Sequence, residues 1–494
     1  MLLTLFYSVA FTFSEFYNSP FSSIKDFLIL FIQWSCISFA TYGLLLLMAL
    51  NRYIFVALFT PMTFLCTVLT YFRYTANVTL TPMIIDLCVV NDMFTGMTLI
   101  SFSLVFVMVL SVIVGVFVSI VRFRMDYPSF IPNFFAGIAI VSICSGLVPR
   151  IERPVLERMP YSLYYNFKKY LQERQVVNAE RPEFKGQALC GSDSITVVMV
   201  IGESLRADHL QLNGYERETT PLLSLDTSVV SFPNIYTEEC YTHTSIPVML
   251  TRADSLNPQI AYTERSFISL FKKAGFRTSW LANQESVKNY VYFMKECDTL
   301  VYANRGKTVY VFDKWMDEEL LPFYDNEVSR HESRKLILLH TIGSHWWYES
   351  HYSEEFRKFE PVIDTRVVSS CTDEELINSY DNTIVYTDYF ITQVIDRIKN
   401  ENAVLIYLSD HGESLGEDGM YLHAADHYTL HYPACFIWMS DMYKKNYPQK
   451  WNSIKKNKDK PYRTDFLFHS ILSAADIKTD YLVDELNVFN FREK

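Results

Sequence analysis

The stretch Ile195-Thr-Val-Val-Met-Val-Ile-Gly-Glu-Ser204 decides the fold, together with Val404-Leu-Ile-Tyr-Leu-Ser-Asp-His411, which has the same layout. In each stretch, an apolar run containing β-branched residues ends in a polar turn. Such a run is typical of a parallel strand buried on both faces, and the parallel strands of α/β sheets present ligand-binding side chains at their carboxyl ends. Because Glu, Asp and His are metal ligands, the two strand ends predict one site for a divalent cation.

For Glu203 alone there is a simpler interpretation, in which it caps a following helix beside Ser204 and Asp208. Helix capping does not account for a second strand that ends in Asp410-His411. Buried carboxylates at strand ends are costly unless they are paired or bound to a metal. We therefore favour Glu203, Asp410 and His411 as metal ligands.

Charge divides the chain into two parts. Residues 1–149 carry ten charged side chains that sum to zero, whereas the other 345 residues carry 89, so the net charge of −11 lies entirely after residue 149. This partition predicts a transmembrane domain over 1–149, an interfacial linker or helix over 150–189, and a polar catalytic domain over 190–494. The acidic second part argues against nucleic-acid binding, which depends on clustered Lys and Arg.

The first part contains apolar runs of the length needed to cross a bilayer. Four are long, and a fifth lacks the basic start and the cleavage site of a signal peptide, so we expect five transmembrane helices: Leu2–Phe16, Phe27–Leu50, Tyr53–Phe72, Thr98–Val121 and Ile131–Val148. Among the arginines, Arg52, Arg122 and Arg124 would lie in the inner loops, against Arg73 outside. By the positive-inside rule, everything after residue 149 lies outside the cytoplasm.

The second part alternates short apolar runs with polar helical segments, a pattern that predicts an α/β fold with a mostly parallel sheet. The predicted strands are Ile195–Ile201, Thr278–Ala282, Leu336–Thr341, Val404–Leu408 and Cys435–Met439. The connector Pro149–Phe184 contains aromatic residues beside Lys168 and Lys169, which fits either a helix lying on lipid headgroups or an ordinary surface linker. None of the nine cysteines forms a C-x-x-C pair, which excludes a zinc ribbon or a thioredoxin motif.

A candidate nucleophile lies where the loop Cys240-Tyr-Thr-His-Thr-Ser245 enters an apolar helical turn. Free backbone N–H groups at a helix N-terminus attract a phosphate, so Thr242, Thr244 and Ser245 compete for the role. Each of them could instead cap the helix. His345, His423 and Lys288 also follow predicted strands and could meet a phosphate, although such residues are more often structural or solvated.

These motifs resemble the phosphoethanolamine transferase family, bacterial inner-membrane enzymes of the alkaline phosphatase and sulfatase superfamily. The resemblance starts at Gly202-Glu-Ser204, continues through Arg206-Ala-Asp208 and Gly343-Ser-His345, and includes Ser409-Asp-His-Gly-Glu-Ser-Leu-Gly416 and Tyr421-Leu-His423. It covers essentially the whole chain. It implies a sulfatase-like catalytic domain that faces the periplasm behind a multi-pass inner-membrane anchor.

The resemblance also implies roles for individual residues. One or two zinc ions are expected, with Glu203, Asp410, His411 and a threonine as ligands. If Ser245-Ile-Pro247 is aligned to the family's motif without a gap, the catalytic threonine falls on Thr242. If the alignment starts from Cys240 instead, it falls on Thr244. The substrate-side residues fall on a set of four: His345, His423, Lys288 and Gln284.

The implied reaction transfers phosphoethanolamine from phosphatidylethanolamine, through a phosphothreonine, to an acceptor in the cell envelope such as lipid A or a lipopolysaccharide core sugar. The chain reads Cys240-Tyr-Thr242 where the members known for polymyxin resistance read Cys-Gly-Thr, which leaves the acceptor open. A phosphoglycerol transferase that uses phosphatidylglycerol and an inactive membrane sensor are the alternatives. A sulfatase activity is disfavoured, because its C/S-x-P-x-R motif would need Arg at Met249.

Overall fold

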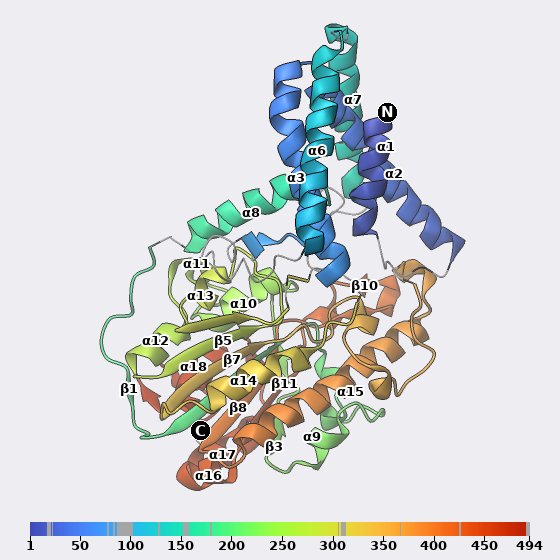
Figure 1. Cartoon of the computed structure of the whole chain (residues 1–494). Helices are drawn as coiled ribbons and strands as arrows, with labels where there is room; N and C mark the ends of the chain where they lie inside the picture. The colour runs from blue at the N-terminus through green and yellow to red at the C-terminus, as the bar shows by residue number, and fades with distance from the viewer. Residues whose placement is uncertain are drawn as a thin grey trace. The chain divides into compact units, whose positions relative to one another are not determined.

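The computed structural model of the chain consists of two compact units (Figure 1). One comprises Met1–Gln172, Arg305–Phe312 and Asp364–Arg366, and the other comprises Glu173–Asn304, Asp313–Ile363 and Val367–Lys494. The structure describes residues 1–16, 21, 23–76, 79–82, 84–85, 102–126, 129–151, 158–177, 180–304, 306–307, 313–365, 367–423 and 426–490.

The first unit is helical. Its long helices are α2 (Ile24–Ala49), α3 (Arg52–Ala76), α6 (Phe102–Arg124) and α7 (Phe130–Ile151), preceded by the short α1 (Leu2–Ala10). Helix α3 packs against α6, and α2 packs against α7. At the second crossing, a Cβ on Gly43 would lie 2.9 Å from Val141 and one on Gly137 2.7 Å from Leu47, so these two glycines allow the helices to approach closely.

Three described helices are long and apolar enough to cross a membrane: Ile24–Ala49, Arg52–Thr75 and Phe102–Arg124. Leu2–Glu15 and Phe130–Cys144 are shorter apolar helices. The first residues of the predicted span Thr98–Val121 lie outside the described part of the chain. Apolar helices are therefore present near all five predicted spans, while the count of five crossings and their orientation stay predictions.

The predicted connector contains a helix, α8 (Ser162–Val177). Residues 152–157 and 178–179 of the connector lie outside the described residues. Whether α8 lies on lipid headgroups stays a prediction, as do the predicted domain boundaries near residues 149 and 189.

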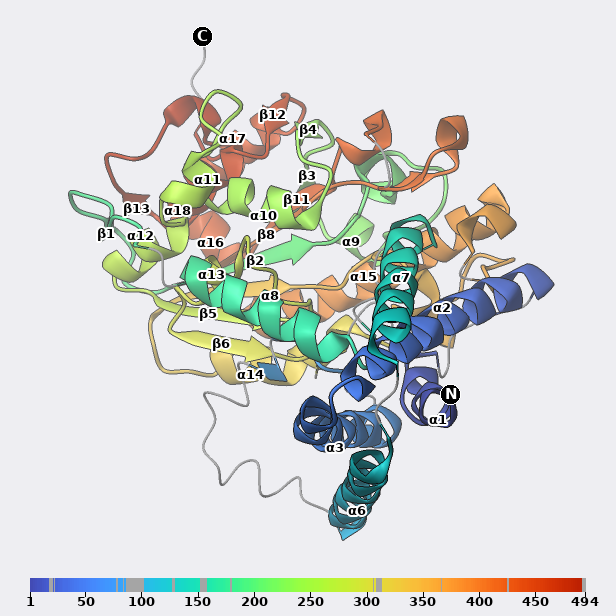
Figure 2. The same cartoon turned by 90° about the horizontal axis from the view of Figure 1, so that it is seen from above.

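The second unit is built on a seven-stranded sheet with the order β3-β11-β8-β2-β7-β5-β6, and Figure 2 shows β6 and β3 at its opposite edges. The strands are β2 (Ile195–Gly202), β3 (Val229–Ser231), β5 (Arg277–Ala282), β6 (Thr299–Tyr302), β7 (Arg334–His340), β8 (Ala403–Ser409) and β11 (Cys435–Met439). All five predicted strands exist, each within two residues of its predicted bounds.

The sheet is mixed. Strands β8, β2, β7, β5 and β6 pair in parallel, whereas β11 runs antiparallel to both β8 and β3. The predicted mostly parallel sheet did not anticipate the reversal at β11. An apolar run such as Cys435–Met439 is buried equally well in either direction, so its pattern does not encode the direction of the strand.

Helices cover both faces of the sheet. Alternate β2 residues, Ile195, Val197, Met199 and Ile201, share an apolar core with α10 (Thr242–Leu250), α12 (Phe267–Lys273) and α18 (Phe466–Ala474). On the opposite face, α14 (Leu321–Val328) contacts β5 and β7 and packs against α15 (Asp373–Ile398). Figure 1 shows α15 in front of the sheet and α18 behind it. This sandwich makes the central strands rigid supports for the side chains at their ends.

Candidate active site

Strand register brings the predicted site residues to one edge of the sheet. Gly202 at the end of β2 pairs with Ser409 at the end of β8, so Glu203 and Asp410 follow paired positions. His340 at the end of β7 pairs with both Ile201 and Ala282, which places the turns after β7 and β5 beside them. Carboxyl ends of parallel strands therefore supply the site, as in other α/β proteins.

Glu203, Asp410 and His411 lie close together and are buried. One ligand atom from each lies within 4.8 Å of the others. Nε2 of His411 is 3.7 Å from Oε1 of Glu203 and 3.5 Å from Oδ2 of Asp410. Two carboxylates and one imidazole at this separation form a donor set that suits a divalent transition metal such as zinc.

The hydrogen bonds of His411 and Asp410 leave atoms that could bind a cation. Nδ1 of His411 lies 2.7 Å from the carbonyl oxygen of Gly412; the carbonyl can only accept, so Nδ1 carries the proton and Nε2 keeps a free lone pair. Oδ1 of Asp410 accepts from the N–H groups of Ser204 and His411, while the buried Oδ2 has no hydrogen-bond partner among the described residues. A bound cation would satisfy that oxygen.

The pKa of Glu203 also indicates that the buried carboxylates would be stabilised by a cation. Burial, followed by the nearby charge of Asp410, raises the pKa of Glu203 well above its usual range. Two neighbouring carboxylates in a buried position repel each other, and a divalent cation between them removes the penalty. The residues present therefore fit the metal that the sequence predicts.

Thr242 is the hydroxyl that faces this group. It is the first residue of α10, and its Oγ1 donates to Oε2 of Glu203 at 3.0 Å and lies 3.4 Å from Nε2 of His411. The Oγ1 of Thr244 instead donates to the carbonyl of Tyr241, away from the carboxylates. Ser245 is buried and donates to the carbonyl of Glu239. Of the three hydroxyls, Thr242 alone has these contacts.

Gln284 and Lys288 separate in the structure. Gln284 is buried after β5, and its Nε2 donates to Oε2 of Glu203 at 2.9 Å. The Lys288 side chain is exposed, and no hydrogen bond or ion pair joins it to other described residues. The structure thus brings Gln284 into the group but does not bring Lys288 to it.

Two predicted histidines lie beside the group. The ring centroids of His411 and His423 are 5.2 Å apart, and those of His345 and His423 are 6.5 Å apart. Burial, together with the neighbouring His423, lowers the pKa of His345 to about 4, so this ring is neutral near pH 7. A neutral imidazole can accept a proton or bind a metal.

Glu413 is a site residue to which the sequence assigned no role. It is fully buried, neither carboxylate oxygen has a hydrogen-bond partner among the described residues, and Oε1 lies 3.5 Å from Nδ1 of His423. A buried carboxylate without hydrogen bonds indicates an unmet need for a cation or a donor. Its place two residues after His411, within the Ser409–Gly416 motif, was an available signal.

Asp317 is a second residue that the sequence did not reveal. It comes from the segment before α14 and accepts hydrogen bonds from the N–H groups of Ile342 and Gly343, at 2.8 and 3.0 Å. The next residue, Ser344, donates its N–H to the carbonyl of Glu203. Asp317 therefore supports the turn that leads to His345. No motif marks it, because only the folded turn brings it near.

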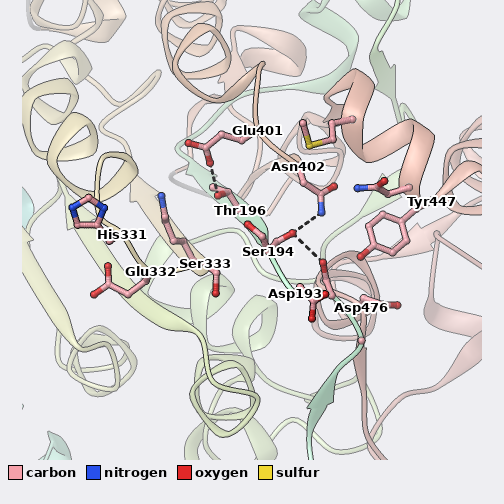
Figure 3. A pocket seen from close by; sticks show the side chains of 15 residues that line it. Asp193, Ser194, Thr196, His331, Glu332, Ser333, Glu401, Asn402, Tyr447 and Asp476 are labelled. Carbon is pink, nitrogen blue, oxygen red and sulfur yellow. Dashed lines mark hydrogen bonds between the residues drawn. The ribbon is translucent and has the colours of Figure 1, made fainter.

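The described unit also contains a polar cavity of about 770 Å³ at the amino ends of the strands (Figure 3). Its lining includes Thr196, whose hydroxyl donates to Glu401, and Asn402, whose amide donates to the carbonyl of Ser194. Thr196 lies at the start of β2, one residue after Ile195, and Glu203 follows the end of β2, so this cavity lies at the other edge of the sheet and shares no residue with the metal group.

Comparison with known proteins adds to this geometry. The sequence model of the sulfatase family matches residues 195–477. The chain is similar to the phosphoethanolamine transferase EptA of Escherichia coli K12, with 33% identity over 302 residues that make up 58% of this chain and 54% of the relative. It is also 32% identical over 262 residues to the phosphatidylethanolamine transferase Mcr-1, covering 51% and 47% of the two chains. The chain thus spans about half the length of the curated relatives it matches.

Solved structures of phosphoethanolamine transferases are also similar to this chain. The soluble domain of lipooligosaccharide phosphoethanolamine transferase A from Neisseria meningitidis superimposes with a TM-score of 0.57 and 29% identity, over 63% of this chain and 98% of that one. The periplasmic domain of EptC from Escherichia coli, a zinc complex, gives a TM-score of 0.56 and 27% identity over 64% and 92%. The integral membrane EptA of Neisseria meningitidis matches 99% of this chain and 97% of its own with a TM-score of 0.58, and at 23% identity this match speaks for the fold.

Proposed function

The chain belongs to the sulfatase family, and on that premise we propose that it is a zinc-dependent phosphoethanolamine transferase. The observation that carries the proposal is the convergence of Thr242 with Glu203 and His411 at the carboxyl ends of β2 and β8. The named relatives act as phosphoethanolamine or phosphatidylethanolamine transferases. Family membership and site geometry thus support the same chemistry.

The donor is phosphatidylethanolamine, and the acceptor is a lipid or glycan of the cell envelope. One relative is named Kdo(2)-lipid A phosphoethanolamine 7''-transferase, and a structural relative is named for lipooligosaccharide. Lipid A or a core sugar is therefore the acceptor class that we favour. Both substrates reside in membranes, which gives the apolar helices a purpose: the 1–149 segment anchors the catalytic domain 190–494 to the periplasmic face of a bacterial inner membrane, with 150–189 as the link.

Glu203, Asp410 and His411 would hold the zinc ion, which supplies Lewis-acid stabilisation of negative charge when bound. The Oγ1 of Thr242 attacks the phosphorus of the donor and gives up its proton, for which Oε2 of Glu203 is the nearest acceptor. The bond between phosphorus and the diacylglycerol oxygen breaks, and diacylglycerol leaves after taking up a proton. The product is a phosphoethanolamine ester of Thr242.

The second half of the reaction regenerates Thr242. An acceptor hydroxyl or phosphate attacks the phosphorus of the ester, and the bond to Oγ1 breaks. His423 lies beside His411, His345 lies beside His423, and these two rings are our candidates for proton transfer at the leaving and attacking oxygens. Gln284 holds Glu203 in place through its amide. Lys288 lacks contacts with this group, so a role for it would require the bound substrate.

The test is the intact mass of the full-length chain in detergent after incubation with zinc and phosphatidylethanolamine. Wild type is compared with Thr242→Ala and with the matched control Thr244→Ala. The proposal expects a phosphoethanolamine adduct on wild type and on Thr244→Ala that is absent from Thr242→Ala. A phosphoglycerol adduct formed instead from phosphatidylglycerol would identify the alternative donor, and no adduct from either lipid on a zinc-loaded chain would refute group transfer.

A further inference from the structure

A second group of metal-ligating side chains lies outside the candidate active site. Cys240, Asp426 and His431 each offer one ligand atom, and these atoms lie within 4.8 Å of one another. The Sγ of Cys240 is 3.6 Å from Oδ1 of Asp426 and 3.9 Å from Nε2 of His431. None of the three belongs to the Glu203 group, although Cys240 precedes Thr242 by two residues.

His431 is oriented in the way that metal-binding histidines are. Its Nδ1 lies 2.7 Å from the carbonyl oxygen of Thr237, so Nδ1 carries a proton, and Nε2, which faces Oδ1 of Asp426, is the atom that an ion would take. The ring stacks on Tyr236 with centroids 5.1 Å apart and an angle of 10° between the planes. The backbone N–H of Thr237 donates in turn to the carbonyl of His431. The ring is therefore fixed before any ion arrives.

The three ligand atoms are close to the spacing of a zinc site. In tetrahedral zinc with bonds of about 2.3 Å to sulfur and about 2.0 Å to nitrogen and oxygen, ligand atoms lie about 3.3–3.6 Å apart. Two of the separations, 3.6 and 3.9 Å, are near this range, whereas Nε2 of His431 and Oδ1 of Asp426 are 2.7 Å apart. The Asp426 side chain is 82% exposed, so it can rotate outward to admit the ion.

The donor chemistry selects the metal. A thiolate with an imidazole and one carboxylate suits zinc, whereas magnesium and calcium prefer sets of oxygen ligands. The described cysteines form no disulfide, so the Cys240 thiol is available. We propose that Cys240, Asp426 and His431 bind a zinc ion, with the fourth position open to water. On binding, zinc replaces the hydrogen bond between Nε2 of His431 and Oδ1 of Asp426, and the proton of that bond and the thiol proton of Cys240 both pass to solvent.

The site would act as a clamp. It would join the segment that leads into α10, where Thr242 begins the helix, to the segment Asp426–His431 that precedes β11. Such a clamp would fix the position of Thr242 relative to the carboxylates. This consequence rests on the proposed function, but metal binding at Cys240 does not.

Cobalt(II) is the probe, because a cobalt–thiolate bond produces a charge-transfer band in the near ultraviolet that oxygen and nitrogen ligands do not produce. The full-length chain in detergent is titrated with cobalt, and zinc is then added to displace it. The Glu203 group contains no sulfur, so the band reports the Cys240 site alone. The phosphoethanolamine adduct on Thr242 reports the proposed function separately.

We expect the band in wild type, in Glu203→Gln and in two matched controls, Cys190→Ser and His427→Gln. Cys240→Ser should lack it, and Asp426→Asn and His431→Gln should bind cobalt at least about ten-fold more weakly. Cys240→Ser should still bind zinc at the Glu203 group, which shows that the variant is folded. A wild type without the band, or a band that persists in Cys240→Ser, would overturn the proposal.

Discussion

The hydroxyl of Thr242 donates to Oε2 of Glu203 at 3.0 Å, and the amide of Gln284 donates to the same oxygen at 2.9 Å. Three segments, the turn after β2, the start of α10 and the turn after β5, therefore meet on one carboxylate. Because the Thr242 hydroxyl is the proposed alcohol nucleophile of this group, its replacement separates chemistry from metal binding.

Thr242→Ser should keep the hydroxyl and hold turnover within about ten-fold of wild type, whereas Thr242→Ala should lose on the order of 10³-fold or more, as when other covalent nucleophiles are removed. Release of diacylglycerol from phosphatidylethanolamine is the measurement. Thr244→Ala is the control and should stay near wild type, because the Thr244 hydroxyl donates to the backbone carbonyl of Tyr241 and not to the metal group. Equal losses in Thr242→Ala and Thr244→Ala would contradict the assignment of the nucleophile.

Glu203→Gln keeps the size of the side chain and removes one negative charge from the metal group. We expect zinc affinity to fall at least about 10- to 100-fold, since changes even to residues behind the ligands have effects of this size. Competition with a chelating dye measures the affinity. Glu401→Gln is the matched control at the opposite end of the sheet, where Glu401 accepts from Thr196. Unchanged zinc affinity in Glu203→Gln would remove Glu203 from the ligand set.

Asp317→Asn tests the buried carboxyl that supports the His345 turn. Burial raises the pKa of Asp317 to about 6, against the opposing effect of hydrogen bonds from Asn283, Ile342 and Gly343. Between pH 3.8 and about 6 the folded protein keeps a proton that the unfolded chain releases, so the stability of wild type falls as pH rises through this window. The difference between the two pKa values corresponds to about 3 kcal/mol.

Asparagine does not titrate, so the stability of Asp317→Asn relative to wild type should rise between pH 4 and 7. Melting temperatures of the two chains, taken at each pH with a chelator present, measure this difference. Asp325→Asn is a control, because Asp325 lies on the surface of α14 beside Arg397. A difference between Asp317→Asn and wild type that is constant with pH would show that Asp317 has an ordinary pKa, and a relative stability of Asp317→Asn that falls as pH rises would show a lowered one.

The central strands were predictable from the sequence because a strand buried on both faces is apolar along its whole length. A short, continuous apolar run is therefore typical of such a strand. Ile195–Ile201 and Cys435–Met439 are examples, and their strands end within one residue of the predicted bounds. The short edge strands β3 and β6 were not predicted, since three or four half-buried residues carry too little pattern. The antiparallel direction of β11 could not be predicted either, because a buried apolar run has the same pattern in either strand direction.

The candidate site was predictable where a motif follows a strand. Glu203, Asp410 and His411 belong to such motifs, and strand pairing alone brings them together. Lys288 also follows a strand, but the turn after β5 directs Gln284 inward and leaves Lys288 exposed. Asp317 and the Cys240 group depend on contacts between distant loops. The conformation of these loops depends on hydrogen bonds between segments far apart in the sequence, such as that between His431 and Thr237, and no spacing in the sequence records them.

Gly343 gives the sharpest test of how the His345 turn supports Glu203. Its φ is +50°, and a Cβ there would lie 2.9 Å from the carbonyl oxygen and 3.1 Å from the nitrogen of Glu203. Gly343→Ala therefore combines strain from the left-handed backbone with a clash against the backbone of Glu203. Together these effects should cost about 2–5 kcal/mol of stability and weaken zinc binding.

Gly214→Ala is the matched control, because Gly214 has a φ of +93° but nothing lies within 4 Å of its would-be Cβ. It should cost only about 1–2 kcal/mol from backbone strain and leave zinc affinity unchanged. Thermal unfolding and zinc competition on both variants separate strain from the clash. If the two alanines lower stability and zinc affinity equally, the turn after β7 does not hold Glu203 in place, and the clash would be relieved by movement of the turn itself.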